Sequence, residues 1–389
     1  MLNPKTNERE LAYIVRVSEA KGLEGYDRVH SCKVLGWWCV APKEIKVGDL
    51  VVYFEIDSLL PSNDSRFAFM EKRKYRVLTQ KMCKTVSQGL ILPLSDFHEL
   101  KNCKEGDFVT DKLHVEKYDP DDVKDEQPKQ KVNDFQRAMD RHRKFFKNQI
   151  VKYLMKYKPV RWVLSKLFVH KKDKDKSKWP EWLPKTGSER IQNLPQLLGS
   201  DEAYVITEKV DGASTSFILD EKNNYLVGSH NVIKNPEEGS DGGNYFKNNI
   251  WAESGAKYNM ESVLRDLKKS NNLKTVAIQG ETYGDKVQKR NYSLKNNTHD
   301  FVVFHIWFDD KRLPIKEMVK ICEDRSLPHV HVYDYNYKIP KSVEDIIADV
   351  DKSKSHIDGG DIEGFVFYSQ DGQTNFKCVS PNFLLKYHR

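Results

Sequence analysis

The stretch Ala203–Leu219, "AYVITEKVDGASTSFIL", decides how the second half of the chain folds. Both of its ends are rich in β-branched and aromatic residues, which predicts two strands joined at the short "KVDG" segment. Lys209 stands at this junction between two acids, Glu208 and Asp211. Such a lysine either forms an ion pair with a neighbouring carboxylate or loses its proton and acts as a nucleophile. The short stretch by itself favours the ion pair.

The remainder of the second half mixes strand-like and helix-like segments. The runs "KTVAIQGETYG", "DFVVFHIWF" and "EGFVFYS" are typical of strands, whereas "MESVLRDLKKS" and "LPIKEMVKICE" have apolar residues at helical spacing. This mixture predicts an α+β domain dominated by antiparallel strands. The sequence has no G-x-G-x-x-G after a strand, no Walker-type phosphate loop and no H-E-x-x-H motif, so none of those three sites is indicated.

The first part of the chain, from about Ala12 to Val115, consists of short β-branched and aromatic runs such as "AYIVRVSEA", "WWCVAP" and "DLVVYFEIDSLLP". Turn residues separate these runs at short spacing, which is the pattern of a small β-barrel or sandwich. A generic antiparallel domain is the alternative. We therefore divide the chain into a first domain at 1–115, a linker at 116–185 and a second domain at 186–389.

The linker is strongly basic. Residues 131–178 contain sixteen Lys and Arg residues against four Asp and Glu residues, with apolar residues near helical spacing. One or two basic amphipathic helices are expected. Three uses remain open for them: docking across the two domains, contact with nucleic acid, or contact with a membrane surface.

Composition and charge narrow the class of protein. The 389 residues include 64 Lys and Arg and 57 Asp and Glu, a formal net charge of +7, which permits a basic face toward a polyanion. The six cysteines show no C-x-x-C and no zinc-type spacing with histidine. The N-terminal segment has no apolar signal core, and no apolar run reaches the roughly 18 residues of a membrane span. We expect a soluble monomer inside the cell, in cytoplasm or nucleus without distinction, and no membrane partner.

A lysine that attacks phosphorus needs neighbours that help it lose its proton and neutralise the phosphate charge. Asp211, Glu281 and Glu363 each lie just beyond a strand-like run, and Lys377 supplies a cation. Mg²⁺ or Mn²⁺ prefers oxygen ligands and retains several waters, so a few converging carboxylates suffice to hold it. The run "FVVFHIWF" offers aromatic side chains on which an adenine base can stack.

The order of these elements resembles a known family. The series "EKVDG", "GSHN", "IQGETYGDKVQKRNY", "FVVFHIWF", "IEGFVF" and "FKCVSPNFLLK" is similar to the motif series of ATP-dependent RNA ligases, which are covalent nucleotidyltransferases. "RVHSCKVLGWWCVAPKEIKVGDLVVYFEIDSLLP" and "KTVSQGLILPL" resemble the OB domain that precedes the catalytic domain in the fifth RNA ligase family. The resemblance implies an N-terminal OB-type β-barrel, a basic helical linker and an antiparallel-sheet-rich, ATP-grasp-like nucleotidyltransferase domain. The basic segment 131–178 has no counterpart in it.

The resemblance implies a reaction in which Lys209 attacks the α-phosphorus of ATP and forms a lysine-adenylate. AMP then passes to a 5′-phosphate, and a 3′-hydroxyl seals the RNA end or nick, where part of the substrate can be DNA. Asp211, Glu281 and Glu363 match the positions that hold Mg²⁺ or Mn²⁺, largely through its waters.

Further positions match the groups around the nucleotide. Lys377 matches the lysine at the α-phosphate, Phe304 the aromatic that stacks on adenine, and Glu208 the residue at the edge of the nucleobase. Glu281, Glu363 and, less directly, Arg190 also match nucleotide contacts. Phe301 and Trp307 compete with Phe304 for the stacking role.

The sequence departs from the family where an arginine usually follows Ser229, because His230 stands there. The position is associated with the RNA 5′-phosphate, so this contact falls to His230 or is shared with Lys234. Val379 replaces a second lysine found in a related branch. A capping-type nucleotidyltransferase and a non-catalytic RNA-binding protein with an OB domain remain the alternative functions.

Overall fold

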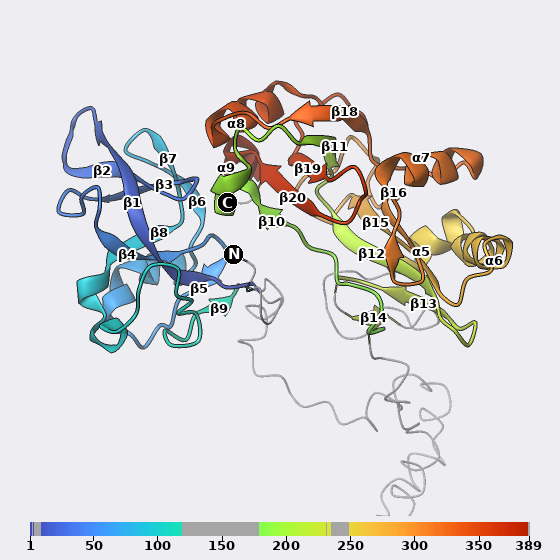
Figure 1. Cartoon of the computed structure of the whole chain (residues 1–389), viewed down its shortest axis with the longest axis horizontal. Helices are drawn as coiled ribbons and strands as arrows, with labels where there is room; N and C mark the ends of the chain where they lie inside the picture. Colours follow the sequence, from blue (N-terminus) through green and yellow to red (C-terminus); the bar gives the residue numbers. More distant parts are fainter. Residues whose placement is uncertain (2, 4–8, 119–178, 231, 235–248, 388–389) are drawn as a thin grey trace, which may run out of the picture. The chain divides into compact units, whose positions relative to one another are not determined.

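The structure is a computed structural model that describes residues 1, 3, 9–118, 179–230, 232–234 and 249–387 (Figure 1). The basic segment predicted at 131–178 lies outside these residues. Most of the linker predicted at 116–185 does so as well. The two predicted domains flanking it are both described.

The N-terminal domain is built on a five-stranded antiparallel sheet, drawn in blue in Figure 1. Its order is β3 (Trp37–Pro42), β2 (Tyr26–Val34), β1 (Ala12–Leu23), β4 (Leu50–Phe54) and β8 (Leu90–Pro93). The long β1 pairs with β4 along its first half and with β2 along its second, and its register shifts between Val17 and Glu19. A strand that changes partner through such an irregularity bends the sheet.

Both faces of this sheet are covered by apolar side chains. Ala12 and Ile14 of β1 belong to one buried cluster, and Tyr13 and Val15 belong to a second on the opposite side. The remaining short elements are β5 (Ser58–Leu59) with β9 (Glu116–Lys117), the hairpin of β6 (Thr79–Met82) and β7 (Thr85–Gln88), and the 3-10 helices η1 (Ser65–Arg73), η2 (Leu94–Asp96) and η3 (His98–Leu100).

Glu55 is a fully buried carboxylate at the end of β4. It forms an ion pair with Arg9, accepts a hydrogen bond from the Tyr13 hydroxyl at 3.3 Å and accepts another from Asn193 Nδ2 at 3.2 Å. Burial opposes its charge, but Arg9 and the N-terminal ammonium, 2.7 Å from Oε2, together outweigh burial and lower the pKa of Glu55 to about 2. The buried charge is therefore well compensated.

Replacing Glu55 with glutamine is expected to lower the free energy of unfolding at pH 7 by about 3 kcal/mol, because Arg9 loses its partner. A carboxyl whose pKa falls on folding stabilises above its unfolded pKa. The difference in the free energy of unfolding between wild type and Glu55→Gln should therefore shrink as the pH drops below about 4.5 toward about 2. Urea unfolding at several pH values measures it. Glu105→Gln, which alters an exposed pair with Arg16, is the control and should change stability by less than about 0.5 kcal/mol.

The C-terminal domain contains two sheets. The first has the order β10 (Glu189–Arg190), β20 (Asn375–Val379), β19 (Gly364–Tyr368), β11 (Ala203–Lys209) and β18 (Val332–Lys338). The second has the order β14 (Ile233–Lys234), β13 (Tyr225–Gly228), β12 (Ala213–Leu219), β15 (Val276–Gly284), β16 (His299–Phe308) and β17 (Lys311–Arg312). The two strands predicted from 203–219 thus belong to different sheets.

Helices pack on both sheets of this domain. The second sheet is covered by α5 (Ile250–Lys257), α6 (Met260–Ser270) and α7 (Ile315–Asp324), whose apolar sides join the largest buried cluster. The first sheet packs against α8 (Val343–Lys352) and the 3-10 turns η6 (Ile191–Asn193) and η7 (Pro195–Leu197), and α9 (Pro381–Tyr387) follows β20. The predicted α+β class is confirmed. No helix within the described ranges is long and apolar enough to cross a membrane.

Candidate functional site

The "KVDG" segment is the point at which the chain passes from one sheet to the other. Lys209 is the last residue of β11, and β12 begins at Ala213. The crossing is tight because a Cβ atom at Gly212 would lie only 2.3 Å from the carbonyl oxygen of Thr282. Only glycine therefore fits at this position.

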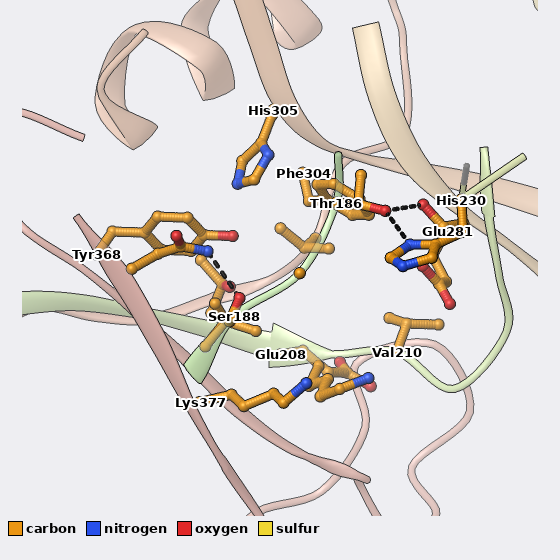
Figure 2. Close-up of a pocket in the computed structure, with 17 residues that line it drawn as sticks. Thr186, Ser188, Glu208, Val210, His230, Glu281, Phe304, His305, Tyr368 and Lys377 are labelled. Carbon is orange, nitrogen blue, oxygen red and sulfur yellow. Dashed lines mark hydrogen bonds between the residues drawn. The ribbon is translucent and has the colours of Figure 1, made fainter. Parts of the chain in front are cut away.

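An open pocket lies at this crossing, with an empty volume of about 780 Å³ (Figure 2). Residues of both sheets line it. The first sheet contributes Glu208, Lys209 and Lys377, and the second contributes Glu281 and Phe304.

Lys209 is paired with Glu363 in this structure. Its Nζ donates to Glu363 Oε2 at 2.7 Å, and the two side chains are 23% and 9% exposed. Burial alone would lower the pKa of Lys209, but Glu363 and Glu281 outweigh burial and raise the pKa above its ordinary value. The amine is therefore held as an ammonium ion. The structure is compatible with both interpretations of Lys209, as an ion-paired lysine and as a nucleophile, because the lysine forms an ion pair and also faces a pocket.

Of the three predicted metal-site carboxylates, Glu281 lines the pocket and Glu363 and Asp211 do not, although the charges of all three act on Lys209. Burial raises the pKa of Glu281 to about 8, and the nearby Glu363 and Asp211 charges add to the rise against the opposing effect of Lys209. Among the residues that the structure describes, no three His, Cys, Asp or Glu side chains are close enough to ligate one ion directly. An excess of buried carboxylates without direct coordination geometry fits a divalent cation that keeps its waters. The residues present therefore fit Mg²⁺ or Mn²⁺ held through water.

Lys377 lines the pocket from β20, next to β19. Burial lowers its pKa to about 7, and the positive charges of Arg190 and Lys209 add to this. An anion in the pocket would reverse these effects and keep the lysine charged. Arg190 pairs with Lys377 in the backbone register but does not line the pocket, and its guanidinium lies 5.7 Å from the centre of the Trp37 ring. Arg190 thus lies behind Lys377.

Of the three aromatic side chains that compete for the stacking role, Phe304 lines the pocket. Phe301 is fully buried in the core against Phe217, and Trp307 donates its indole N–H to Gln279 Oε1 at 2.8 Å. The β15–β16 ladder is irregular at this point, because Val303 pairs with Gly280 and His305 with Gln279, which leaves Phe304 without a partner. A bulge of this kind redirects a side chain.

Glu208 also lines the pocket, and a loop holds its carboxylate. Oε1 accepts a hydrogen bond from the Ser355 hydroxyl at 2.5 Å, and Oε2 accepts one from the backbone N–H of His356 at 3.0 Å. Burial raises the pKa of Glu208, and these hydrogen bonds oppose the rise.

His230 is part of a polar chain on the pocket wall. Its Nδ1 lies 2.8 Å from Thr186 Oγ1, which lies 2.6 Å from Ser214 Oγ (Figure 2). Burial lowers the pKa of His230 to about 4, and Lys117, Lys377 and Lys185 contribute in that order. The imidazole is therefore neutral at pH 7 and surrounded by cations. Lys234 is the last residue of β14, and its side chain lies outside the described residues.

Sequence reasoning missed several pocket residues. Thr186, Ser214, His305 and Tyr368 line the pocket and were not predicted. A period-two signal was present for Tyr368, since Val366 and Tyr368 of β19 face the pocket while Phe365 and Phe367 are buried in the core behind it. His305 follows the bulge and depends on it.

Two domain models match the chain in comparisons with known proteins. The RNA ligase family model matches residues 202–388, and an OB-fold domain model matches residues 11–94. No curated protein matches the chain at a significant level.

The solved structures that match are those of an RNA ligase from Naegleria gruberi. An apo form of a variant is 25% identical, has a TM-score of 0.73, and the match covers 97% of this chain and 97% of that one. A variant with AMP and Mn is 25% identical with a TM-score of 0.73, covering 98% and 99%. A variant with ATP and Mn is 24% identical with a TM-score of 0.73, covering 97% and 99%.

Proposed function

Because the chain belongs to the RNA ligase family, with an OB-fold domain ahead of its ligase domain, we propose that it seals 3′-hydroxyl and 5′-phosphate RNA ends or nicks through a lysine-adenylate on Lys209. It is an ATP-dependent RNA ligase that uses a divalent metal ion. The observation that carries the proposal is the position of Lys209, which faces an open pocket lined also by Glu281 and Lys377 and donates to the Glu363 carboxylate.

In the first step, the lone pair of Lys209 Nζ attacks the α-phosphorus of ATP. A P–N bond forms, the bond from the α-phosphorus to the bridging oxygen breaks, and pyrophosphate leaves. The amine must first lose the proton that Glu363 stabilises. Lys377, charged when an anion is present, neutralises the α-phosphate.

Asp211, Glu281 and Glu363 would hold the metal through its waters, because a divalent cation there would favour the charged form of Glu281, whose pKa burial and the other two carboxylates raise to about 8. A divalent cation bound at these carboxylates would supply positive charge that favours the neutral amine and offsets the negative charge of the phosphate oxygens. The carboxylates then serve the metal rather than the lysine.

The adenine base is proposed to stack on Phe304 with its edge toward Glu208. Phe304→Ala is expected to raise the KM for ATP in lysine labelling about 10-fold or more, with a smaller effect on kcat, because an aromatic platform contributes about 1–3 kcal/mol per base. The KM measured with labelled ATP tests this. Phe308→Ala, near the far end of the same strand and outside the pocket lining, is the control. A KM for Phe304→Ala within twofold of wild type would exclude the stacking role.

In the later steps, a 5′-phosphate oxygen of the RNA attacks the phosphorus of the lysine-adenylate and releases the Lys209 amine. The 3′-hydroxyl then attacks the adenylylated 5′-phosphate, and AMP leaves. The 5′-phosphate is proposed to bind near His230, where Lys117, Lys185 and Lys377 make the surroundings positive. Lys234 is proposed as a second contact. Arg190 is proposed to act on the nucleotide through its neighbour Lys377.

One labelling experiment tests the proposed function. The protein is incubated with α-³²P-ATP or α-³²P-GTP and Mg²⁺ or Mn²⁺, then separated on a denaturing gel. We expect covalent label from ATP, and transfer of that label to a nicked duplex with an RNA 3′-hydroxyl end, followed by sealing. Label from GTP alone would indicate capping-type chemistry, and no label from either nucleotide would indicate a non-catalytic RNA-binding protein.

We further propose that the protein acts as a monomer inside the cell, on nicked duplexes or RNA ends in which part of the substrate can be DNA. All six cysteines are unpaired, which is typical of a reducing compartment.

A further inference from the structure

Arg290 and Asp358 form a buried ion pair beside the nucleophile but outside the pocket lining. Arg290 Nη2 donates to Asp358 Oδ1 at 2.6 Å, and the two side chains are only 5% and 11% exposed. The two residues are far apart in sequence, and neither lines the pocket. A buried ion pair is weak evidence for stability, since desolvation offsets most of its attraction. Its position suggests another purpose.

Asp358 anchors the loop that holds Glu208. This loop is closed on itself, because Ser355 N–H donates to Gly360 O at 2.8 Å and Gly359 N–H donates to Ser355 O at 2.8 Å. Asp358 Oδ1 also accepts the N–H of Gly360 at 3.0 Å. Ser355 and the next residue in the loop then donate to the two Glu208 oxygens. Fixing Asp358 therefore fixes the Glu208 carboxylate.

Arg290 makes a second connection, to Asp211. Its guanidinium lies over the Tyr292 ring at 3.7 Å, and the Tyr292 hydroxyl accepts the backbone N–H of Asp211 at 2.5 Å. Tyr292 is 2% exposed and packs edge-on against Tyr283. Asp211 follows Lys209 by two residues, whereas Glu208 precedes it by one. The ion pair thus connects to both sides of the nucleophile.

The approach of the loop to Arg290 is close. A Cβ atom at Gly360 would lie 2.7 Å from Arg290 Nη2, so the loop meets the guanidinium without space for a side chain. A charged pair this tightly enclosed has one arrangement available to it.

We propose that the Arg290–Asp358 pair is a positioning clamp that holds Glu208 for the nucleotide on one side of Lys209 and Asp211 for the metal on the other. This inference rests on the proposed function for the roles of Glu208 and Asp211. Arg290 and Asp358 touch neither ligand in it. They act through Ser355 and Tyr292, which form the two branches of the clamp.

Binding measurements separate the two branches. The affinity for Mn²⁺ is measured by electron paramagnetic resonance and the affinity for ATP by calorimetry, on the full-length protein without turnover. Tyr292→Phe keeps the ring but weakens the contact to Asp211, and we expect a Mn²⁺ dissociation constant about 5-fold higher with unchanged ATP affinity. Ser355→Ala removes a donor to Glu208, and we expect an ATP dissociation constant about 5-fold higher with unchanged Mn²⁺ affinity.

The central variants should affect both ligands. Asp358→Asn is expected to raise the dissociation constants of both Mn²⁺ and ATP by about 5-fold or more. In a Tyr292→Phe/Ser355→Ala double variant, adding Asp358→Asn should change neither dissociation constant much further. If Asp358→Asn does not fold, Arg290→Lys takes its place, because it keeps the charge but loses the planar fork. Asp266→Asn, which alters an exposed pair with Arg325, is the control and should change neither affinity.

Two results would overturn the clamp: central variants that fold with both affinities unchanged, or branch variants that each weaken both ligands equally. Neither readout depends on labelling of Lys209. Wild-type protein that binds ATP and Mn²⁺ but takes no label would contradict the proposed function and leave the clamp to be judged by the same binding data.

Discussion

Replacing Lys209 with alanine is expected to abolish covalent labelling from α-³²P-ATP, with a loss of at least about 10⁴-fold, because no other group can form the P–N bond. Sealing of a nicked substrate that carries a plain 5′-phosphate should fall equally. Sealing of a substrate whose 5′-phosphate is already adenylylated bypasses the lysine as nucleophile, so it should fall much less. Gel assays of the three reactions with one protein preparation measure this pattern.

The matched control is Lys222→Ala, which removes an exposed lysine from the β12–β13 turn of the same domain. It should label as wild type does. Retained labelling in Lys209→Ala would place the adenylate on another residue. An equal loss in all three reactions would indicate a folding defect instead of a missing nucleophile.

Replacing Glu363 with glutamine is expected to have the second largest effect. Two consequences oppose each other, because Glu363 raises the pKa of Lys209 and is also one of the three carboxylates proposed to hold the metal. Loss of the carboxylate charge weakens the metal site, and we expect labelling at pH 7 to fall about 100-fold or more. The amide also no longer stabilises the ammonium, so the pKa of Lys209 falls.

The pH dependence separates these consequences. The neutral amine is the reactive form, and a lower pKa makes it available at lower pH. Single-turnover labelling between pH 6 and pH 10 should therefore show the rising limb of Glu363→Gln shifted toward acid relative to wild type, although its plateau is lower. Asp361→Asn, an exposed acid paired with Lys354 and Lys386, should leave rate and profile unchanged. A limb shifted toward alkali would contradict the assigned effect of Glu363 on Lys209.

Much of the architecture was predictable from local pattern. The strands around Lys209 and the α+β class are confirmed, and the RNA ligase family model matches residues 202–388, where the motif series lies. Lys209 and Glu363 meet because each lies at or beside a strand end, whereas Glu281, predicted just beyond a strand, lies within β15 and pairs with Ser214. Their roles in catalysis, and the domain boundaries at 115 and 185, stay predictions.

What could not be predicted depends on register and on distant pairing. Phe304 rather than Phe301 lines the pocket because β16 has a bulge at Phe304. A bulge within an apolar run has no recognisable sequence pattern. Arg190 lies near Trp37 because β10 is the edge strand of its sheet, next to the strand β20 that carries Lys377. The position of a two-residue strand in a sheet cannot be predicted from its sequence. Arg290 and Asp358 are 68 residues apart, in the segments after β15 and before β19, so no local pattern indicates their pairing.

The ion pair between Lys209 and Glu363 has a consequence for the ligase at rest. An ammonium has no lone pair, so acylating agents, aldehydes and other electrophiles of the cell find no reactive amine in the empty pocket. An exposed lysine is also mainly an ammonium at neutral pH, but the raised pKa of Lys209 leaves an even smaller fraction of reactive amine as long as its carboxylate partner remains in place. The ion pair thus lowers the reactivity of Lys209 Nζ toward electrophiles while the pocket is empty.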